Sequence, residues 1–173
     1  MKKIKIQERK GFTLLEMMMV IAIIGILSSL ILVSVDRDSG VVQSAAREFA
    51  TDLRSLKRSA LNGTIPTGGG YACEFRLNPI VASFTSYTFS FRSKNSPTDA
   101  CSGFNTYAPY NPKALKNGVF FRDGVGELIF SVPHGEVITG GGVIYTLKRG
   151  SKCAGVTVSV SGDIVEDGLS DCP

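Results

Sequence analysis

The sequence has very little histidine, and this scarcity excludes most catalytic and metal-binding arrangements. Any catalytic Ser-His-Asp triad or Cys-His pair would need its one histidine, His134. This residue lies in the turn-like segment 132–136, and no nucleophile motif surrounds that segment. Neither glycine run, 68–70 or 140–142, leads into Lys-Ser or Lys-Thr at a helix start, so the pattern of a phosphate-binding loop is missing. We interpret His134 as a surface turn residue. We expect the protein not to be an enzyme and to hold no cofactor.

An excess of positive charge is also missing once the first ten residues are set aside. Of the 19 Lys and Arg and the 15 Asp and Glu, five basic and one acidic residue lie in segment 1–10, which leaves 14 of each sign. A broad basic surface for nucleic acid is therefore not expected. Lys148, Arg149 and Lys152 form a short basic loop, which we interpret as solvated. The alternative is modest, salt-sensitive contact with DNA phosphates.

Acidic residues crowd the C-terminal end of the sequence. Asp163, Glu166 and Asp167 bring several carboxylates into a short segment, and clustered oxygens can hold calcium. Their spacing matches no EF-hand loop. We favour a solvated acidic edge without a metal, with a calcium site as the alternative.

Charge is almost absent from residues 12–35, where Glu16 is the only charged side chain before Asp36. These 24 residues, as a helix rising about 1.5 Å per residue, are long enough to cross a hydrocarbon core of about 30 Å. The basic flank 1–10 predicts that the N-terminus stays in the cytoplasm and that the rest of the chain lies outside it. A cleaved secretory signal peptide would have a shorter apolar region and a small-residue cleavage site.

Glu16 is out of place in such a helix, because a buried carboxylate costs several kcal/mol unless it is paired. No basic residue follows within the next helical turns. A cut between Gly11 and Phe12 would create an α-amino cation four residues away, which could pair with Glu16 in the same chain or in a neighbouring subunit.

The segment Gly11-Phe12-Thr13-Leu14-Leu15-Glu16, with its basic leader and apolar helix, closely resembles the prepilin signature of type IV pilins and type II secretion pseudopilins. In that family a membrane peptidase cuts after the glycine, and the new N-terminal Phe is N-methylated. The glutamate pairs with the N-terminus of an adjacent subunit during filament assembly. The resemblance implies these roles for Gly11, Phe12 and Glu16. It implies other pilin subunits, the peptidase/methyltransferase and the inner membrane as partners.

The apolar helix is predicted to continue as an amphipathic helix over residues 36–62. Val42, Phe49 and Leu53 belong to an apolar series at three- and four-residue steps, while charged residues fill the other faces. The dipeptide Asn62-Gly63 predicts the end of the helix.

Residues 63–173 predict a β-rich domain. Five segments are expected to be strands, and the last four alternate apolar and polar side chains; they are 71–77, 87–91, 128–132, 143–147 and 156–160. The turn 161–163 should lead into a further strand. Residues 93–117, rich in Pro, Asn, Ser and Gly, predict a long surface loop.

All four cysteines follow the apolar segment, on the side expected to be oxidising. An even count there suggests two disulfides, and four cysteines allow three connectivities. We favour Cys73–Cys101 and Cys153–Cys172, because each pair closes a loop of moderate length. A zinc site is disfavoured, because no two cysteines have the spacing of a metal-binding knuckle.

A long N-terminal helix followed by an antiparallel sheet is the α+β pilin architecture that the resemblance implies. The domains would be leader 1–11, filament-core half-helix 12–35, amphipathic half-helix 36–62 and extracytoplasmic domain 63–173. The segment 130–135 and the final Val-rich strand ending in Ser-Gly also resemble the GspH/FimT class of minor pseudopilins and minor pilins. We expect a structural subunit of a pilus or secretion pseudopilus. The alternative is a tip minor pilin that binds DNA or another extracellular ligand.

Overall fold

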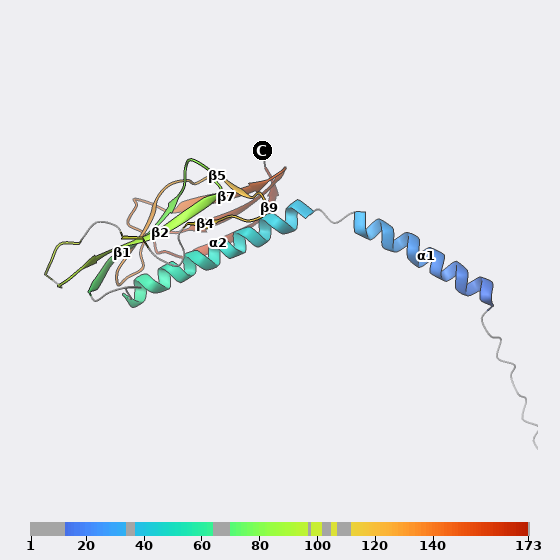
Figure 1. The fold of residues 1–173 in the computed structure, drawn as a ribbon, viewed down its shortest axis with the longest axis horizontal. Coiled ribbons are helices and arrows are strands. Elements are labelled where there is room, and N and C mark those ends of the chain that lie inside the picture. Colours follow the sequence, from blue (N-terminus) through green and yellow to red (C-terminus); the bar gives the residue numbers. More distant parts are fainter. Residues whose placement is uncertain are drawn as a thin grey trace, which may run out of the picture. The chain divides into compact units, whose positions relative to one another are not determined.

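The computed structural model describes residues 13–33, 37–63, 70–96, 98–101, 105–106 and 112–172. The chain divides into two compact units, Met1–Asp36 and Arg37–Pro173, each of which is described here by itself (Figure 1). The first unit contains the helix α1, and the second contains the helix α2 and all the strands.

Helix α1 (Leu14–Val33) lies within the apolar run of the sequence. It has 20 residues, against the 24 of the whole run. In the described parts of the chain, no helix is long and apolar enough to cross a membrane, in contrast to the transmembrane span expected over 12–35.

Helix α2 (Arg37–Asn62) has the expected amphipathic pattern. Its buried apolar side chains recur at three- and four-residue steps; they are Val42, Ala45, Ala46, Phe49, Ala50, Leu53, Leu56 and Ala60. The helix ends where predicted, because Gly63 adopts a left-handed φ of 60° and its N–H donates to the Ala60 carbonyl. The expected single helix is described as two, α1 and α2; its junction, 34–36, lies outside the described residues.

The strands form two antiparallel sheets, whereas the sequence analysis expected one. The first sheet has the order β3-β2-β1-β6, with β4 also paired to β2. Its strands are β1 (Tyr71–Pro79), β2 (Ser86–Lys94), β3 (Asn105–Thr106), β4 (Lys113–Ala114) and β6 (Leu128–Ser131). The predicted loop 93–117 was therefore partly wrong, because β3 and β4 lie within it and both pair with β2.

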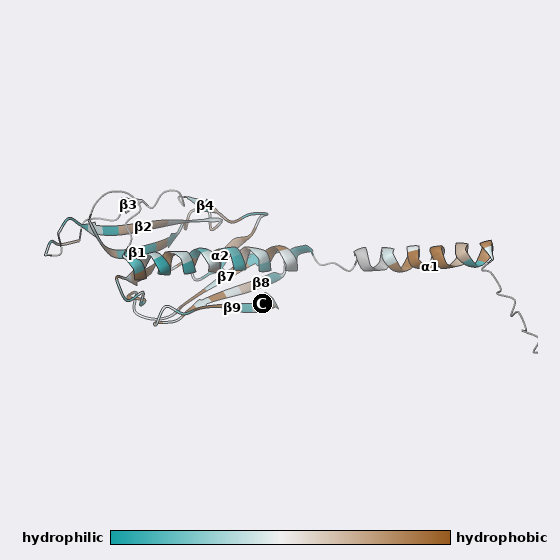
Figure 2. Cartoon of the chain, turned by 90° about the horizontal axis from the view of Figure 1, so that it is seen from below, coloured by the Kyte–Doolittle hydropathy of each residue, from teal (hydrophilic) through white to brown (hydrophobic). Residues whose placement is uncertain are grey.

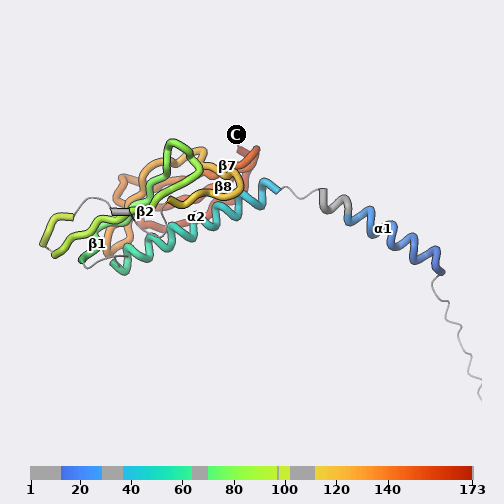
Figure 3. The backbone as a smooth tube through the Cα atoms, in the orientation of Figure 1, coloured from blue at the N-terminus to red at the C-terminus, as the bar shows by residue number. Residues whose placement is uncertain are grey.

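The second sheet has the order β5-β7-β8-β9. Its strands are β5 (Phe120–Asp123), β7 (Val143–Arg149), β8 (Lys152–Val158) and β9 (Ile164–Asp171). Strands β7 and β8 form a hairpin that can be followed along the chain trace in Figure 3. The predicted return turn is confirmed: Gly162 has φ 77° and its N–H donates to the Ser159 carbonyl, before β9 pairs with β8.

Helix α2 packs against both sheets, so its apolar stripe is shared between them. It contacts β1 and β6 of the first sheet and β7, β8 and β9 of the second, and Figure 2 shows it running between them. Phe49 is at the centre, with ring centroids 5.1–5.2 Å from those of Tyr87 on β2, Phe121 on β5 and Tyr145 on β7. All three ring pairs are edge-to-face, the geometry that aromatic quadrupoles favour.

Candidate functional site

The first turn of α1 positions the predicted assembly residue, Glu16. The Thr13 carbonyl and hydroxyl oxygens both accept from the Glu16 backbone N–H, at 3.1 and 3.2 Å, so Thr13 caps the helix. The Glu16 carboxylate is exposed in this turn, where the helix dipole favours a negative charge. The predicted cleavage and methylation positions, Gly11 and Phe12, lie outside the described residues.

The rest of α1 presents an apolar surface on all sides. Every described side chain of this helix, over residues 14–28, is exposed. Leu14 is 79% exposed, Ile21 67% and Ile24 57%. Apart from Glu16 the helix is apolar or small throughout, and Figure 2 shows most of its length in the hydrophobic colours. Contiguous apolar surface of this kind marks a place where lipid or another protein binds.

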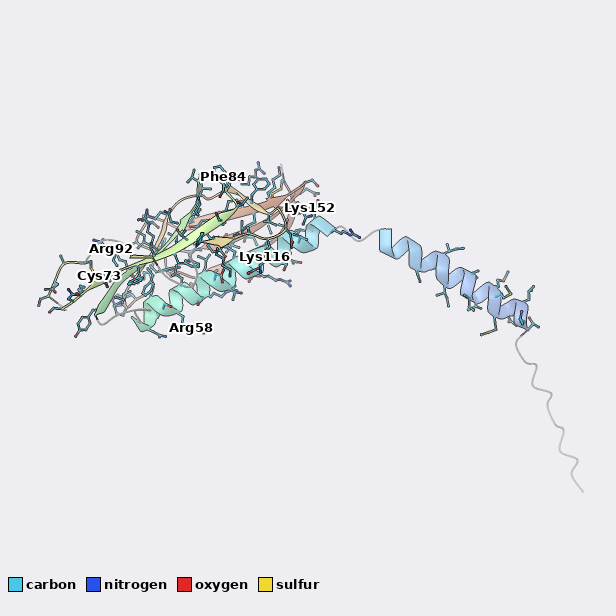
Figure 4. All side chains as sticks on the ribbon, viewed as in Figure 1. Arg58, Cys73, Phe84, Arg92, Lys116 and Lys152 are labelled. Atoms are coloured by element: carbon cyan, nitrogen blue, oxygen red, sulfur yellow. A yellow bond between two sulfur atoms is a disulfide. The ribbon has the colours of Figure 1, made fainter. Side chains whose placement is uncertain are left out.

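Two disulfides with the predicted pairing tie a loop and the C-terminal end of the domain to its sheets. Cys73 on β1 is bonded to Cys101, across a Cα–Cα distance of 6.3 Å. Cys153 on β8 is bonded to Cys172 just beyond β9, across 5.3 Å. No free cysteine is found. The first bond anchors the segment between β2 and β3 (Figure 4 labels Cys73), and the second holds the C-terminal strand.

A buried acid on α2 connects the helix to β2 and β4. Asp52 is 8% exposed; its Oδ2 accepts a hydrogen bond from the Tyr87 hydroxyl at 2.5 Å and lies 2.6 Å from Lys113 Nζ. Glu48, one turn earlier on α2, lies 3.4 Å from Lys113 Nζ and 3.1 Å from Lys116 Nζ. The two carboxylates and two ammonium groups form one alternating network that holds the 113–116 segment against α2.

The network changes the protonation behaviour of its members. Burial, together with the bond to Asp52, raises the pKa of Tyr87 well above 10.0 and keeps its hydroxyl neutral. Burial alone would favour neutral Lys113, but the hydrogen bonds and charges of Asp52 and Glu48 outweigh it and raise its pKa. The hydrogen bond from Lys116 lowers the pKa of Glu48. The sequence analysis missed this network, because its members are separated by up to 68 residues.

The predicted basic loop is largely occupied by contacts within the domain. Arg149 Nε lies 3.0 Å from Asp38 Oδ1 at the start of α2, and Lys152 Nζ donates to Asp171 Oδ1 at 2.6 Å. Lys148 lies on β7, where it is paired in register with Phe120 of β5 and Cys153 of β8. Two of the three cations proposed for nucleic acid are thus neutralised by acidic partners.

The three weak calcium candidates are not brought together. Asp163 accepts from Ser161 and lies 3.6 Å from Lys57; the Ser161 hydrogen bond, followed by the Lys57 charge, lowers its pKa. Glu166 accepts from Arg54 at 2.9 Å, and Asp167 accepts from Thr157 at 2.6 Å. Within the ranges that the structure describes, no three acidic, histidine or cysteine side chains form a metal-binding group. His134 is exposed in the turn after β6, as expected.

Comparison with known proteins gives one finding. Residues 7–32 match the family model of the prokaryotic N-terminal methylation motif. No curated protein and no solved structure matches the chain. The matched segment includes Gly11, Phe12 and Glu16, so the resemblance noted in the sequence is confirmed there, and the motif is typical of structural proteins. The chain therefore carries the N-terminal signature of type IV pilin and pseudopilin precursors, which implies a membrane-anchored N-terminus, an extracytoplasmic mature domain and assembly with other pilin subunits.

Proposed function

We propose that this protein is a minor pilin or minor pseudopilin, cut between Gly11 and Phe12, methylated at Phe12 and assembled into a filament through α1. The observation that carries the proposal is the exposed apolar surface of α1, which directly follows the cleavage position within the methylation motif. The sheet domain then forms the part of the subunit that faces outward.

The energetic argument rests on burial. Covering one Leu or Ile side chain is worth about 1.5–3 kcal/mol, and α1 exposes many, among them Leu14, Ile21 and Ile24. A helix that is apolar on all sides is stable only when it is surrounded. Before assembly, lipid around the N-terminal segment would supply that surrounding; in the filament, the same helix of neighbouring subunits would.

Glu16 would set the axial alignment of neighbouring α1 helices, which apolar contacts alone do not determine. It is the only charged residue in α1 and sits in the exposed first turn. Once α1 is surrounded by apolar groups, an unpaired carboxylate costs several kcal/mol. Pairing with the new α-amino group of a neighbouring subunit removes that cost at one axial position only.

The two disulfides support the proposed location of the sheet domain. Disulfides persist in oxidising compartments and are rare in the cytosol, and both lie in the unit that follows α1. We therefore place residues 63–173 on the extracytoplasmic side of the inner membrane and the leader on its cytoplasmic side.

The test is the variant Glu16→Gln, expressed with the full set of filament proteins. Mass spectrometry of the variant should show loss of residues 1–11 and one added methyl group, as in the wild type, because the cleavage position is intact. Its yield in sheared filaments should fall at least about tenfold, since one missing ion pair in an apolar surrounding is worth more than 1.4 kcal/mol.

The matched control is Glu136→Gln, which removes an exposed carboxylate from the sheet domain and should assemble normally. Wild-type filament yield for Glu16→Gln would contradict the pairing role. An unprocessed N-terminus in the wild-type protein would contradict the proposed function itself.

A further inference from the structure

A positively charged cleft lies between the last turns of α2 and the turn that precedes β9. Its volume is about 230 Å³, and its lining consists of Arg54, Lys57, Arg58 and Leu61 on α2 with Gly162, Asp163 and Ile164. Lys57 and Arg58 follow Arg54 by three and four positions, and Leu61 follows them by four and three, so all four lie on one side of the helix. Three cations and one carboxylate line the cleft, and Glu166 beside it pairs with Arg54, so one positive charge remains in excess.

Lys57 lies in this cleft beside two glycines. A Cβ atom on Gly162 would lie 3.2 Å from Lys57 Cε, and one on Gly135 would lie 3.4 Å from the same atom, so the lysine stem packs closely along both backbones. The ammonium group lies 3.4 Å from the Ser161 carbonyl oxygen and 3.6 Å from Asp163 Oδ1. These two contacts keep the ammonium group at this edge of the cleft.

Arg54 makes two hydrogen bonds within the domain, and its guanidinium has further N–H donors. Its Nη1 donates to Glu166 Oε1 at 2.9 Å and its Nη2 to the Ile164 carbonyl at 3.3 Å. A guanidinium carries five N–H donors, so these two contacts leave three. Its orientation is fixed by β9 while part of its fork remains available.

Arg58 is the third cation and the one without an acidic partner. It is exposed one turn after Arg54, toward the end of α2 (labelled in Figure 4). Among the residues that the structure describes, no carboxylate forms an ion pair with it. Asp163 does not serve this purpose, because its carboxylate accepts from Ser161 at 2.8 Å and pairs with Lys57.

We propose that this cleft binds an oxyanion, the carboxylate or phosphate group of a ligand. Two guanidinium groups and an ammonium group provide the planar forks and point charge that such groups require. The excess of cations excludes a metal ion as the occupant. A water molecule occupies about 30 Å³ of liquid, so the cleft admits a phosphate or carboxylate together with a few waters. This site is separate from α1 and does not depend on the filament role.

The test is a titration of the ¹⁵N-labelled full-length chain in a neutral detergent at pH 7 and constant ionic strength. Inorganic phosphate, sodium acetate and sodium chloride are used in separate titrations. Phosphate, acetate or both should cause saturable shifts of the Gly162 and Asp163 amide signals, and chloride should not. Saturation by phosphate alone identifies a phosphate ligand, and saturation by acetate alone identifies a carboxylate ligand. Shifts no larger than those with chloride would overturn the proposal.

Two single-charge variants locate the binding. Arg58→Gln removes an exposed cation and should weaken the saturable binding about tenfold, without loss of the folded spectrum. Lys116→Gln removes another exposed cation, one that pairs with Glu48 elsewhere on the domain, and should leave the affinity unchanged. Equal weakening in both variants, or none in Arg58→Gln, would show that no binding site exists in this cleft.

Discussion

The two helices of this chain differ in the burial of their apolar side chains. α2 places one apolar stripe against two sheets of its own chain and exposes its charged face. Every described side chain of α1 is exposed, although the helix is apolar or small apart from Glu16. Since apolar surface is stable only when it is covered, α2 is stabilised from within the chain and α1 must be stabilised from outside it.

The comparison predicts first that replacing a large apolar residue by alanine changes the free energy of unfolding of the sheet domain strongly in α2 and little in α1. Phe49→Ala removes the ring that contacts Tyr87, Phe121 and Tyr145 and should cost about 3–5 kcal/mol. Ile23→Ala on α1, where the side chain is 51% exposed, should change the stability by less than about 0.5 kcal/mol. Guanidinium unfolding of the full chain, followed by tyrosine near-ultraviolet circular dichroism, measures both. Similar losses for the two variants would show that α1 is part of the same folded core.

A smaller effect is expected at the polar contact between α2 and the first sheet. Asp52→Asn removes the charge that pairs with Lys113 and weakens the acceptor for Tyr87, which should cost about 1–3 kcal/mol. Glu48→Gln, in a more exposed position on the same helix, is the control and should cost less than about 1 kcal/mol. Denaturant midpoints at pH 7 give both values. A larger loss for the control would mean that Glu48, and not the buried Asp52, holds the 113–116 segment.

The smallest expected effect is on the pH dependence of the free energy of unfolding, through the hydrogen bond from Tyr87 to Asp52 of α2. The folded pKa of Tyr87 is raised above its unfolded value of 10.0, so its stabilising contribution is complete below pH 10 and is lost as the pH rises toward the folded pKa. Between pH 10 and 11.5 the unfolding free energy should therefore fall, and Tyr87→Phe should reduce this slope by about 1.4 kcal/mol per pH unit. Tyr71→Phe, at a half-exposed position, is the control for loss of a tyrosine hydroxyl outside the core. An unaltered slope in Tyr87→Phe would indicate that the hydroxyl ionises in the folded protein.

Local patterns in the sequence predicted the elements well but not their arrangement. The stripe of Val42, Phe49 and Leu53 and the stop at Gly63 depend on neighbouring residues, and both were confirmed. The division into two sheets was missed, because it depends on where α2 places Phe49 between strands far apart in sequence. The short strand β4 was missed because Lys113–Ala114 pairs with β2 over only two residues, too few for an alternating pattern.

The candidate sites, too, could be predicted where the signal is local in the sequence and were missed where it depends on contacts between distant residues. The methylation motif was found because its residues are contiguous, and the disulfide pairs were predicted because each closes a loop of moderate length. The Asp52–Lys113 pair and the cleft of Arg54, Lys57 and Arg58 were missed. The three cations of the cleft were read only as the polar face of α2, because the turn at Gly162 that completes it lies about 100 residues later.

The central claim, that α1 is covered by the same helix of other subunits, is tested most directly by site-specific photocrosslinking at Ile23 in sheared filaments. A photoreactive phenylalanine analogue at this exposed position should join the chain to a second pilin-type subunit. Mass spectrometry should place the joined peptide within that subunit's N-terminal apolar helix. Crosslinks confined to the chain's own residues 37–173, or to lipid alone, would contradict the account.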